Sequence, residues 1–263
     1  MSGAIPDATI AFLAISTAIA FGLPIGLVAY YRLRHRIALI VAGSGAAVWL
    51  AFALGLEGAL HTVVLPLIDP GSQPFVFGAY GALAAGVFEE VGRYVALLFF
   101  LKTRRQWKDG MAFGIGHGGA ESIVIAALPF SQLLVLAMMI NSGTFAQVEG
   151  LLPEEASSAI RQSLTATDPY LFLVGGMERA FAISVHIALS MVVLYGLATG
   201  KGIRFLLIAI AFHAGVDFLP ALYQAGVVDL ALTEAMVGVF AGASLFVIYL
   251  ARKRWPVIPA AAP

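Results

Sequence analysis

The stretch FVFGAYGALAAGVFEEVGRYVALLFFL, residues 75–101, is long and apolar enough to cross a lipid bilayer as a helix. It nevertheless carries three charged residues near its middle, Glu89, Glu90 and Arg93. Charged side chains are costly in hydrocarbon, and in membrane helices they almost always face the interior of a bundle and mark a functional site. The stretch therefore predicts both a membrane helix bundle and a polar site inside it.

The composition of the whole chain is that of an integral membrane protein. Of 263 residues, 60% are hydrophobic and 11% are charged, whereas a soluble domain has about 25% charged residues. Lysine plus arginine balance aspartate plus glutamate at 15 each, so no net charge favours a nucleic-acid partner. The absence of cysteine excludes disulfides, thiolate metal ligands and a cysteine nucleophile.

Apolar stretches long enough to span occur near residues 8–30, 37–60, 75–101, 109–128, 170–199, 203–223 and 230–251. Basic clusters lie at 32–36, 102–108, 201–204 and 252–254, while the intervening connections are poor in lysine and arginine or acidic. By the positive-inside rule we expect the N-terminus outside and the C-terminus in the cytosol.

We therefore predict an all-α polytopic membrane bundle of seven spans. Residues 130–142 are apolar but short for a span, and we expect them to form a re-entrant or interfacial helix; the alternative is eight full spans. Residues 145–167 suit a surface helix or lid. We expect one transmembrane domain, 1–255, with the core of the site in 75–223 and a disordered cytosolic tail, 256–263.

Further titratable residues interrupt three other predicted spans: His117 and Glu121, then Glu178, Arg179 and His186, then His213 and Asp217. At about 1.5 Å per helical residue, most of these groups lie roughly 14–22 Å from the nearest basic cluster, as do the two glutamates of 75–101. Such a shared depth predicts one common site near the bilayer midplane. By contrast, we interpret Glu57 and His61 as inter-helix hydrogen-bonding groups, and the Glu178–Arg179 pair is open to interpretation as an internal ion pair.

The residue types and motifs in the predicted spans limit the chemistry that such a site can perform. A zinc-protease helix with His-Glu-x-x-His is absent, and only one aspartate lies at the depth needed for an aspartyl pair. What remains is glutamate with histidines. A glutamate can activate water as a general base, and a histidine can position water or protonate the leaving amine.

Three motifs on separate predicted helices carry a family resemblance: Glu89-Glu90-Val-Gly-Arg93, Phe113-Gly-Ile-Gly-His117 and His213-Ala-Gly-Val-Asp217. At these residues the chain resembles the CAAX protease and bacteriocin-processing (CPBP) superfamily of glutamate-type intramembrane proteases, and most closely its YhfC-like branch. The Gly-His-Gly-Gly-x-Glu form ending at Glu121 matches that branch. Two departures are the closer spacing of Arg93 and the aspartate at 217, where many members have asparagine.

The resemblance implies an intramembrane endopeptidase of the bacterial cytoplasmic membrane, acting on a peptide or membrane-protein substrate. It implies Glu89 as the base that activates water, supported by Glu90 and Arg93, with His117 holding the water or moving its proton. His213 and Asp217 would complete the oxyanion side. The residues expected around this set are Phe113, Glu121, Glu178, Arg179 and His186.

Two other hypotheses remain open at this point. A metalloenzyme version needs a divalent ion, with zinc as the candidate, held by His117, His186 and His213 together with Glu89 or, alternatively, Glu121. A non-enzyme version is a proton-coupled transporter or a non-catalytic membrane scaffold, since buried networks of this kind also serve as proton relays. The glutamate-type endopeptidase requires no cofactor, and all of these hypotheses require a lipid bilayer.

Overall fold

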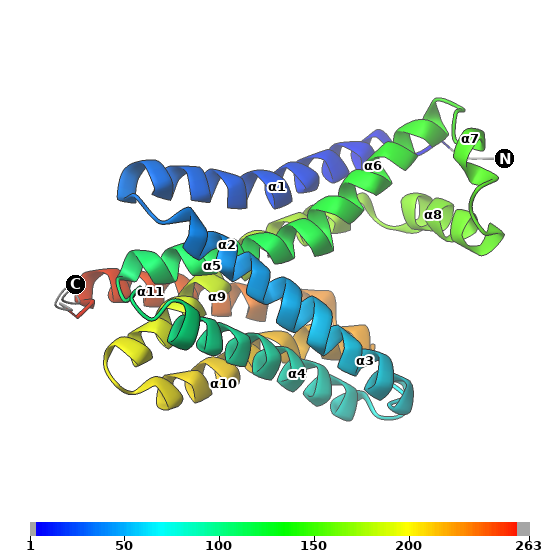
Figure 1. Cartoon of the computed structure of the whole chain (residues 1–263). Helices are drawn as coiled ribbons and strands as arrows, with labels where there is room; N and C mark the ends of the chain where they lie inside the picture. Colours follow the sequence, from blue (N-terminus) through cyan, green and yellow to red (C-terminus); the bar gives the residue numbers. More distant parts are fainter. Residues whose placement is uncertain (1–3, 257–263) are drawn as a thin grey trace. The chain divides into compact units, whose positions relative to one another are not determined.

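The computed structural model describes residues 4–256, and within that range it contains helices and connecting turns but no strand (Figure 1). The elements are α1 Asp7–His35, α2 Leu39–Trp49, η1 Leu50–Glu57, α3 Gly58–Val64, η2 Leu65–Leu67, α4 Pro74–Val95, η3 Ala96–Phe100, α5 Trp107–Ser122, η4 Ile123–Ala127, α6 Leu128–Asn141, α7 Ala146–Glu149, α8 Glu154–Ala166, α9 Pro169–Ala198, α10 Gly202–Gln224 and α11 Leu230–Arg254. The all-α prediction is confirmed. The expected tail lies outside the described residues except for Pro256.

Six helices among the described residues are long and apolar enough to cross a membrane: Asp7–His35, Leu39–Leu67, Trp107–Asn141, Pro169–Ala198, Gly202–Gln224 and Leu230–Arg254. Each corresponds to a predicted span. The seventh predicted span, 75–101, is helical as α4 and η3 but is not among the six. It is the helix that carries Glu89, Glu90 and Arg93.

The prediction of a separate partial helix at 130–142 is wrong, because α5, η4 and α6 form one continuous helix of 35 residues. Its sequence has no glycine between Glu121 and Asn141, and Pro129 lies in the first turn of α6, where a helix tolerates proline. The helix ends where Gly143 adopts a left-handed conformation, with φ of 74°. At about 1.5 Å per residue this helix is longer than the ~30 Å hydrocarbon core.

The chain divides into two compact units, which we describe separately. The first consists of residues 4–25 and 122–180. Its core contains Leu13, Ala137 and Leu164, all fully buried. The predicted surface helix of 145–167 is present as α8, and its Arg161 pairs with Glu149 at 3.0 Å.

The second unit consists of residues 26–121 and 181–256. Its apolar core includes Leu97, Phe113, Val193 and Ala209, from four different helices. Here α2 and α5 pack with their backbones in contact. A Cβ at Gly45 would collide with the carbonyl oxygen of Phe113, and one at Gly116 would collide with that of Ala42. Small residues allow such close approach between membrane helices.

Helices α4 and α10 pack closely and antiparallel. A Cβ at Gly86 would lie 2.9 Å from the Ile210 carbonyl oxygen, and one at Gly78, two turns earlier, would lie 2.9 Å from the Leu222 side chain. The residue numbers rise along one helix as they fall along the other, which defines the antiparallel direction. This packing brings the charged turn of α4 against the middle of α10.

Candidate functional site

Four helices of the second unit bring titratable side chains together. Glu89, Glu90 and Arg93 come from α4, His117 and Glu121 from α5, His186 from α9, and His213 and Asp217 from α10. Six of the eight are buried, and Glu90, Arg93 and His117 are completely so. The side chains that the sequence predicted to form a polar cluster inside the bundle therefore lie together. The contacts described below show which of them pair with one another.

Glu90 and Arg93 form a buried ion pair within α4. The Nη1 atom of Arg93 donates to both carboxylate oxygens of Glu90, at 2.8 and 2.9 Å. Both side chains are 0% exposed, and their spacing of three residues places them on one face of the helix. Of the two adjacent glutamates, Glu90 is thus the partner of the arginine, and Glu89 is left for other contacts.

The same carboxylate also orients His213. The Glu90 Oε1 atom lies 2.8 Å from His213 Nδ1, and since a carboxylate accepts, Nδ1 carries the proton. The other ring nitrogen, Nε2, lies 3.3 Å from Asp217 Oδ2. Asp217 is one turn further along α10 and its side chain is 36% exposed. A histidine held at Nδ1 by a carboxylate presents Nε2 to whatever occupies the site.

Glu89 contacts the imidazoles of the other helices. Its Oε2 atom accepts from His117 Nε2 at 2.7 Å and lies 3.8 Å from His186 Nδ1. The second nitrogen of His117, Nδ1, is buried and has no hydrogen-bond partner among the described residues. The Phe113 ring, one turn earlier on α5, lies nearly parallel to the His117 ring, at 6.2 Å between centroids and 26° between planes.

His186 occupies the centre of the cluster. Its ring centroid lies 4.8 Å from that of His117 and 5.4 Å from that of His213. Arg93 Nη2 is 3.1 Å from His186 Nδ1, and because a guanidinium only donates, Nδ1 is the acceptor. The proton of a neutral His186 is then on Nε2, which contacts Glu121 Oε2.

Three of these residues fit a divalent metal ion. One ligand atom from each of Glu89, His186 and His213 lies within 4.8 Å of the others, and all three residues are buried. Carboxylate oxygen and imidazole nitrogen are zinc ligands, and two histidines with one glutamate is a known catalytic set. Glu90, behind His213, is the kind of carboxylate that orients a ligating histidine. His117, the fourth ligand of the metalloenzyme hypothesis, contacts Glu89 but is not one of the three.

Glu178 and Arg179, which the sequence analysis expected around this set, lie in the first unit and are described separately. They form an ion pair with each other at 2.8 Å, as the simpler interpretation of the sequence expected.

Glu57 is a buried acid that the sequence interpretation treated as purely structural. It is 6% exposed. Its Oε1 atom is 3.1 Å from His61 Nε2, and His61 Nδ1 is 2.9 Å from the Tyr80 hydroxyl. The sequence signal that could have marked Glu57 as a site candidate was its charge, which lies inside an apolar span and four residues before a histidine.

The family is decided by a comparison of the whole chain with known proteins. Residues 19–241 match the family model described as YhfC intramembrane metalloprotease. The chain belongs to this YhfC family. This match confirms the YhfC-like branch of the resemblance inferred from three short motifs, and its range contains every residue of the cluster.

A similar relative comes from Bacillus subtilis (strain 168), where it is described as an uncharacterized membrane protein YhfC. The two sequences are 41% identical over 251 residues, which cover 93% of this chain and 96% of the relative. No solved structure matches the chain. As a YhfC family member with six candidate spans, the chain is an integral membrane protein.

Proposed function

We propose that this YhfC family member is an intramembrane endopeptidase that hydrolyses a peptide bond of a membrane-embedded substrate at the Glu89–His186–His213 cluster. The observation that carries the proposal is the convergence of these three buried side chains from three helices. Buried titratable groups are costly in a membrane helix, and a site able to activate water explains why they are grouped.

A divalent metal ion would be held by Glu89, His186 and His213. When bound, it would supply Lewis-acid polarisation of the scissile carbonyl and of water. The chain's own groups prepare one member of this donor set, His213, whereas His186 would have to exchange its contact with Arg93 or Glu121 for the ion. Glu90 keeps the His213 proton on Nδ1, so that Nε2 is available as a ligand. The Glu90–Arg93 pair thereby acts as a positioning element and does not need to contact the substrate.

The glutamate-type mechanism uses the same residues without a required ion, and the Glu89–His117 contact of 2.7 Å supports it. Glu89 would accept a proton from water, and His117 would transfer a proton toward the leaving amine. His117 suits this role because its Nδ1 atom has no hydrogen-bond partner and, with the ring proton on Nε2, can take up the proton that is passed on. Asp217 would hold the His213 ring, which avoids placing its negative charge against the oxyanion. The resemblance to the wider CPBP superfamily favours this mechanism.

The decisive experiment combines metal content with cleavage. Purified wild-type protein would be analysed for bound metals by mass spectrometry and incubated with a library of labelled transmembrane peptides in proteoliposomes. We expect cleavage by the wild type and its loss in Glu89→Gln. About one metal ion per chain, lost together with cleavage in His186→Ala, supports the metal mechanism.

Two outcomes separate the alternatives. Cleavage by metal-free protein that still requires Glu89 supports the glutamate mechanism. Absence of cleavage across the library, or unchanged cleavage in Glu89→Gln, contradicts the proposed hydrolysis at this cluster. Glu154→Gln is the matched control, because that glutamate is exposed at the start of the surface helix α8, and it should retain activity.

A further inference from the structure

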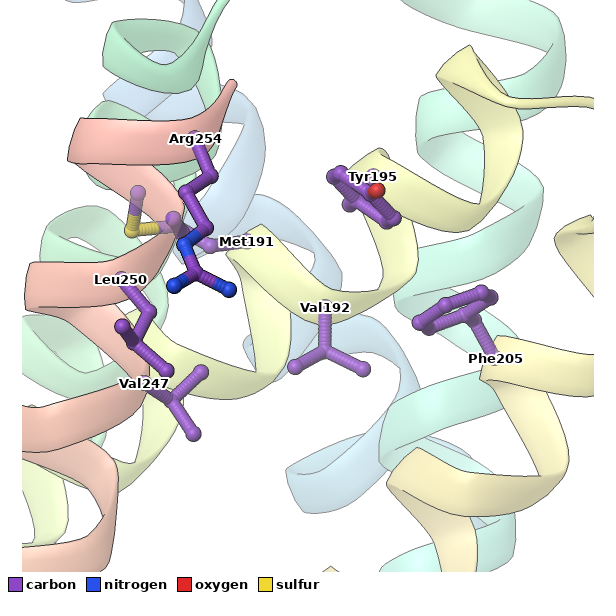
Figure 2. A pocket seen from close by; sticks show the side chains of 8 residues that line it. Met191, Val192, Tyr195, Phe205, Val247, Leu250 and Arg254 are labelled. Carbon is purple, nitrogen blue, oxygen red and sulfur yellow. The ribbon is translucent and has the colours of Figure 1, made fainter. Parts of the chain in front are cut away.

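An apolar pocket of about 290 Å³ opens between α9, α10 and α11 of the second unit, well away in sequence from the charged turn of α4 (Figure 2). Its apolar walls come from all three helices: Met191 and Val192 of α9, Phe205 of α10, and Val247 and Leu250 of α11. Its size is near the lower end of the ~300–1,000 Å³ that is usual for small-molecule sites. Such walls suit a hydrocarbon chain.

One cation lies at this pocket. Figure 2 shows the Arg254 side chain extending from the end of α11, with its guanidinium directed into the space between Leu250 and Val192. Arg254 is exposed, and within residues 4–256 no ion pair or hydrogen bond of its side chain is found. The neighbouring cations do have partners, because Arg252 lies over the Trp107 ring and Lys253 near the Tyr249 ring. Arg254 is therefore the cation of this cluster best placed to receive an external anion.

Aromatic residues place the pocket at a membrane surface. Tyr195 lines the pocket and meets the Trp255 ring edge-on, at 5.9 Å between centroids. Trp255 is itself held by a 2.8 Å hydrogen bond from its Nε1 to the Arg105 carbonyl oxygen. Tyrosine and tryptophan are enriched at the level of lipid headgroups. This enrichment favours headgroup level for the arginine, with the apolar walls deeper along the same helices.

We propose that this pocket binds an anionic phospholipid, with one acyl chain between α9, α10 and α11 and the headgroup phosphate at Arg254. Basic pockets between membrane helices on the cytoplasmic side are a recognised mode of binding anionic headgroups. The charge distinguishes this ligand from an apolar chain without a headgroup, which gains nothing from the guanidinium. The site is separate from the Glu89–His186–His213 cluster and does not depend on the proposed hydrolysis.

The test uses the full chain in detergent with equal amounts of phosphatidylglycerol and phosphatidylcholine. Native mass spectrometry measures which lipid is retained. Lipids with brominated acyl chains, in a Trp49→Phe, Trp107→Phe background, report proximity to Trp255 by quenching its fluorescence. We expect retention and quenching to favour phosphatidylglycerol, and Arg254→Gln to weaken its binding about five-fold or more.

Two matched variants make the result decisive. Lys253→Gln removes the neighbouring charge outside the pocket and should leave the preference for phosphatidylglycerol unchanged. Val247→Phe fills the pocket without changing charge and should lower both retention and quenching. Equal binding of the two lipids, equal effects of Arg254→Gln and Lys253→Gln, or full binding in Val247→Phe would each overturn the proposal.

Discussion

The variant Glu90→Gln should destabilise the folded protein by about 3–5 kcal/mol, the cost of removing one partner from a buried ion pair. The change conserves shape but removes the carboxylate that receives two hydrogen bonds from Arg93 and one from His213. Since Arg93 is completely buried, water cannot reach its guanidinium and solvate it in place of the missing carboxylate. The guanidinium is then left largely uncompensated in the bundle.

The adjacent variant Glu89→Gln is the internal reference for this magnitude. The main hydrogen bond of Glu89 comes from His117 Nε2, and an amide oxygen can still accept it. We therefore expect a loss of only about 1 kcal/mol, the usual scale of a weakened neutral hydrogen bond. Two isosteric changes at neighbouring positions thus differ by about 2–4 kcal/mol because one glutamate neutralises an arginine and the other faces imidazoles.

Both variants can be measured by denaturant unfolding in mixed micelles, followed by tryptophan fluorescence. A double-mutant cycle adds Arg93→Gln and the combination Glu90→Gln/Arg93→Gln. The double variant should be less destabilised than the sum of the singles, by up to about 3 kcal/mol, because it leaves no unpaired charge. Equal destabilisation by Glu89→Gln and Glu90→Gln, or an additive cycle, would refute the assigned pairing.

Three further predictions test the packing, the surface helix and the orientation. Gly45→Ala should destabilise the protein by about 1–3 kcal/mol, because its Cβ meets a backbone carbonyl of α5, whereas Gly43→Ala has nothing within 4 Å and should be neutral or stabilising in the same unfolding assay. A hydrogen bond from Ser157 and the neighbouring Arg161 hold the pKa of Glu149 below its ordinary value of 4.5. This contact stabilises above pH 4.5 and is lost as the pH falls through the lowered pKa, so the rate at which pepsin cuts 145–167 should rise as the pH falls through that acidic range; Glu149→Gln should show no such pH step beyond that of pepsin itself. A single cysteine at position 154 should react with a membrane-impermeant reagent from outside intact cells, and labelling only from the cytosol would reverse the predicted orientation.

The presence of a polar cluster was predictable from the sequence because charged side chains are costly in the hydrocarbon of a lipid bilayer. A charge such as Glu89 in an apolar span has few stable environments other than the interior of a bundle. The three histidines lie at similar depths on their helices, so they had to meet if those helices were neighbours. Membrane helices and their inward-facing charges therefore follow from local sequence and the physics of the bilayer.

The partner of each glutamate was not predictable in this way. Glu89 and Glu90 lie four and three residues before Arg93, and both spacings allow a contact within one helix. The choice depends on α10, because His213 donates to Glu90 from the side where Arg93 already lies. That arrangement belongs to tertiary packing, in particular to the close approach of α4 and α10 at Gly86.

The length of the helix that ends at Asn141 was missed for a related reason. The bilayer sets the minimum length of a span, but it sets no maximum for a helix that continues into water or along the membrane surface. The apolar segment 130–142 was judged by its own length, although Pro129 is the only helix breaker between it and α5. The structure accommodates this proline directly after the wider turns of η4, where the helical hydrogen-bond pattern has already changed.

Glu89 and Glu90 have different partners, and this difference has a chemical consequence. Successive side chains on a helix point about 100° apart, so Glu90 turns toward a permanent cation and Glu89 turns toward His117 and His186. The charge of Glu90 is balanced by Arg93 in every protonation state of the histidines. Glu89 has no such fixed balance in these contacts, because an imidazole is a cation only when protonated. A proton or a divalent metal ion can supply the missing positive charge, and these are the two species on which the proposed mechanisms depend.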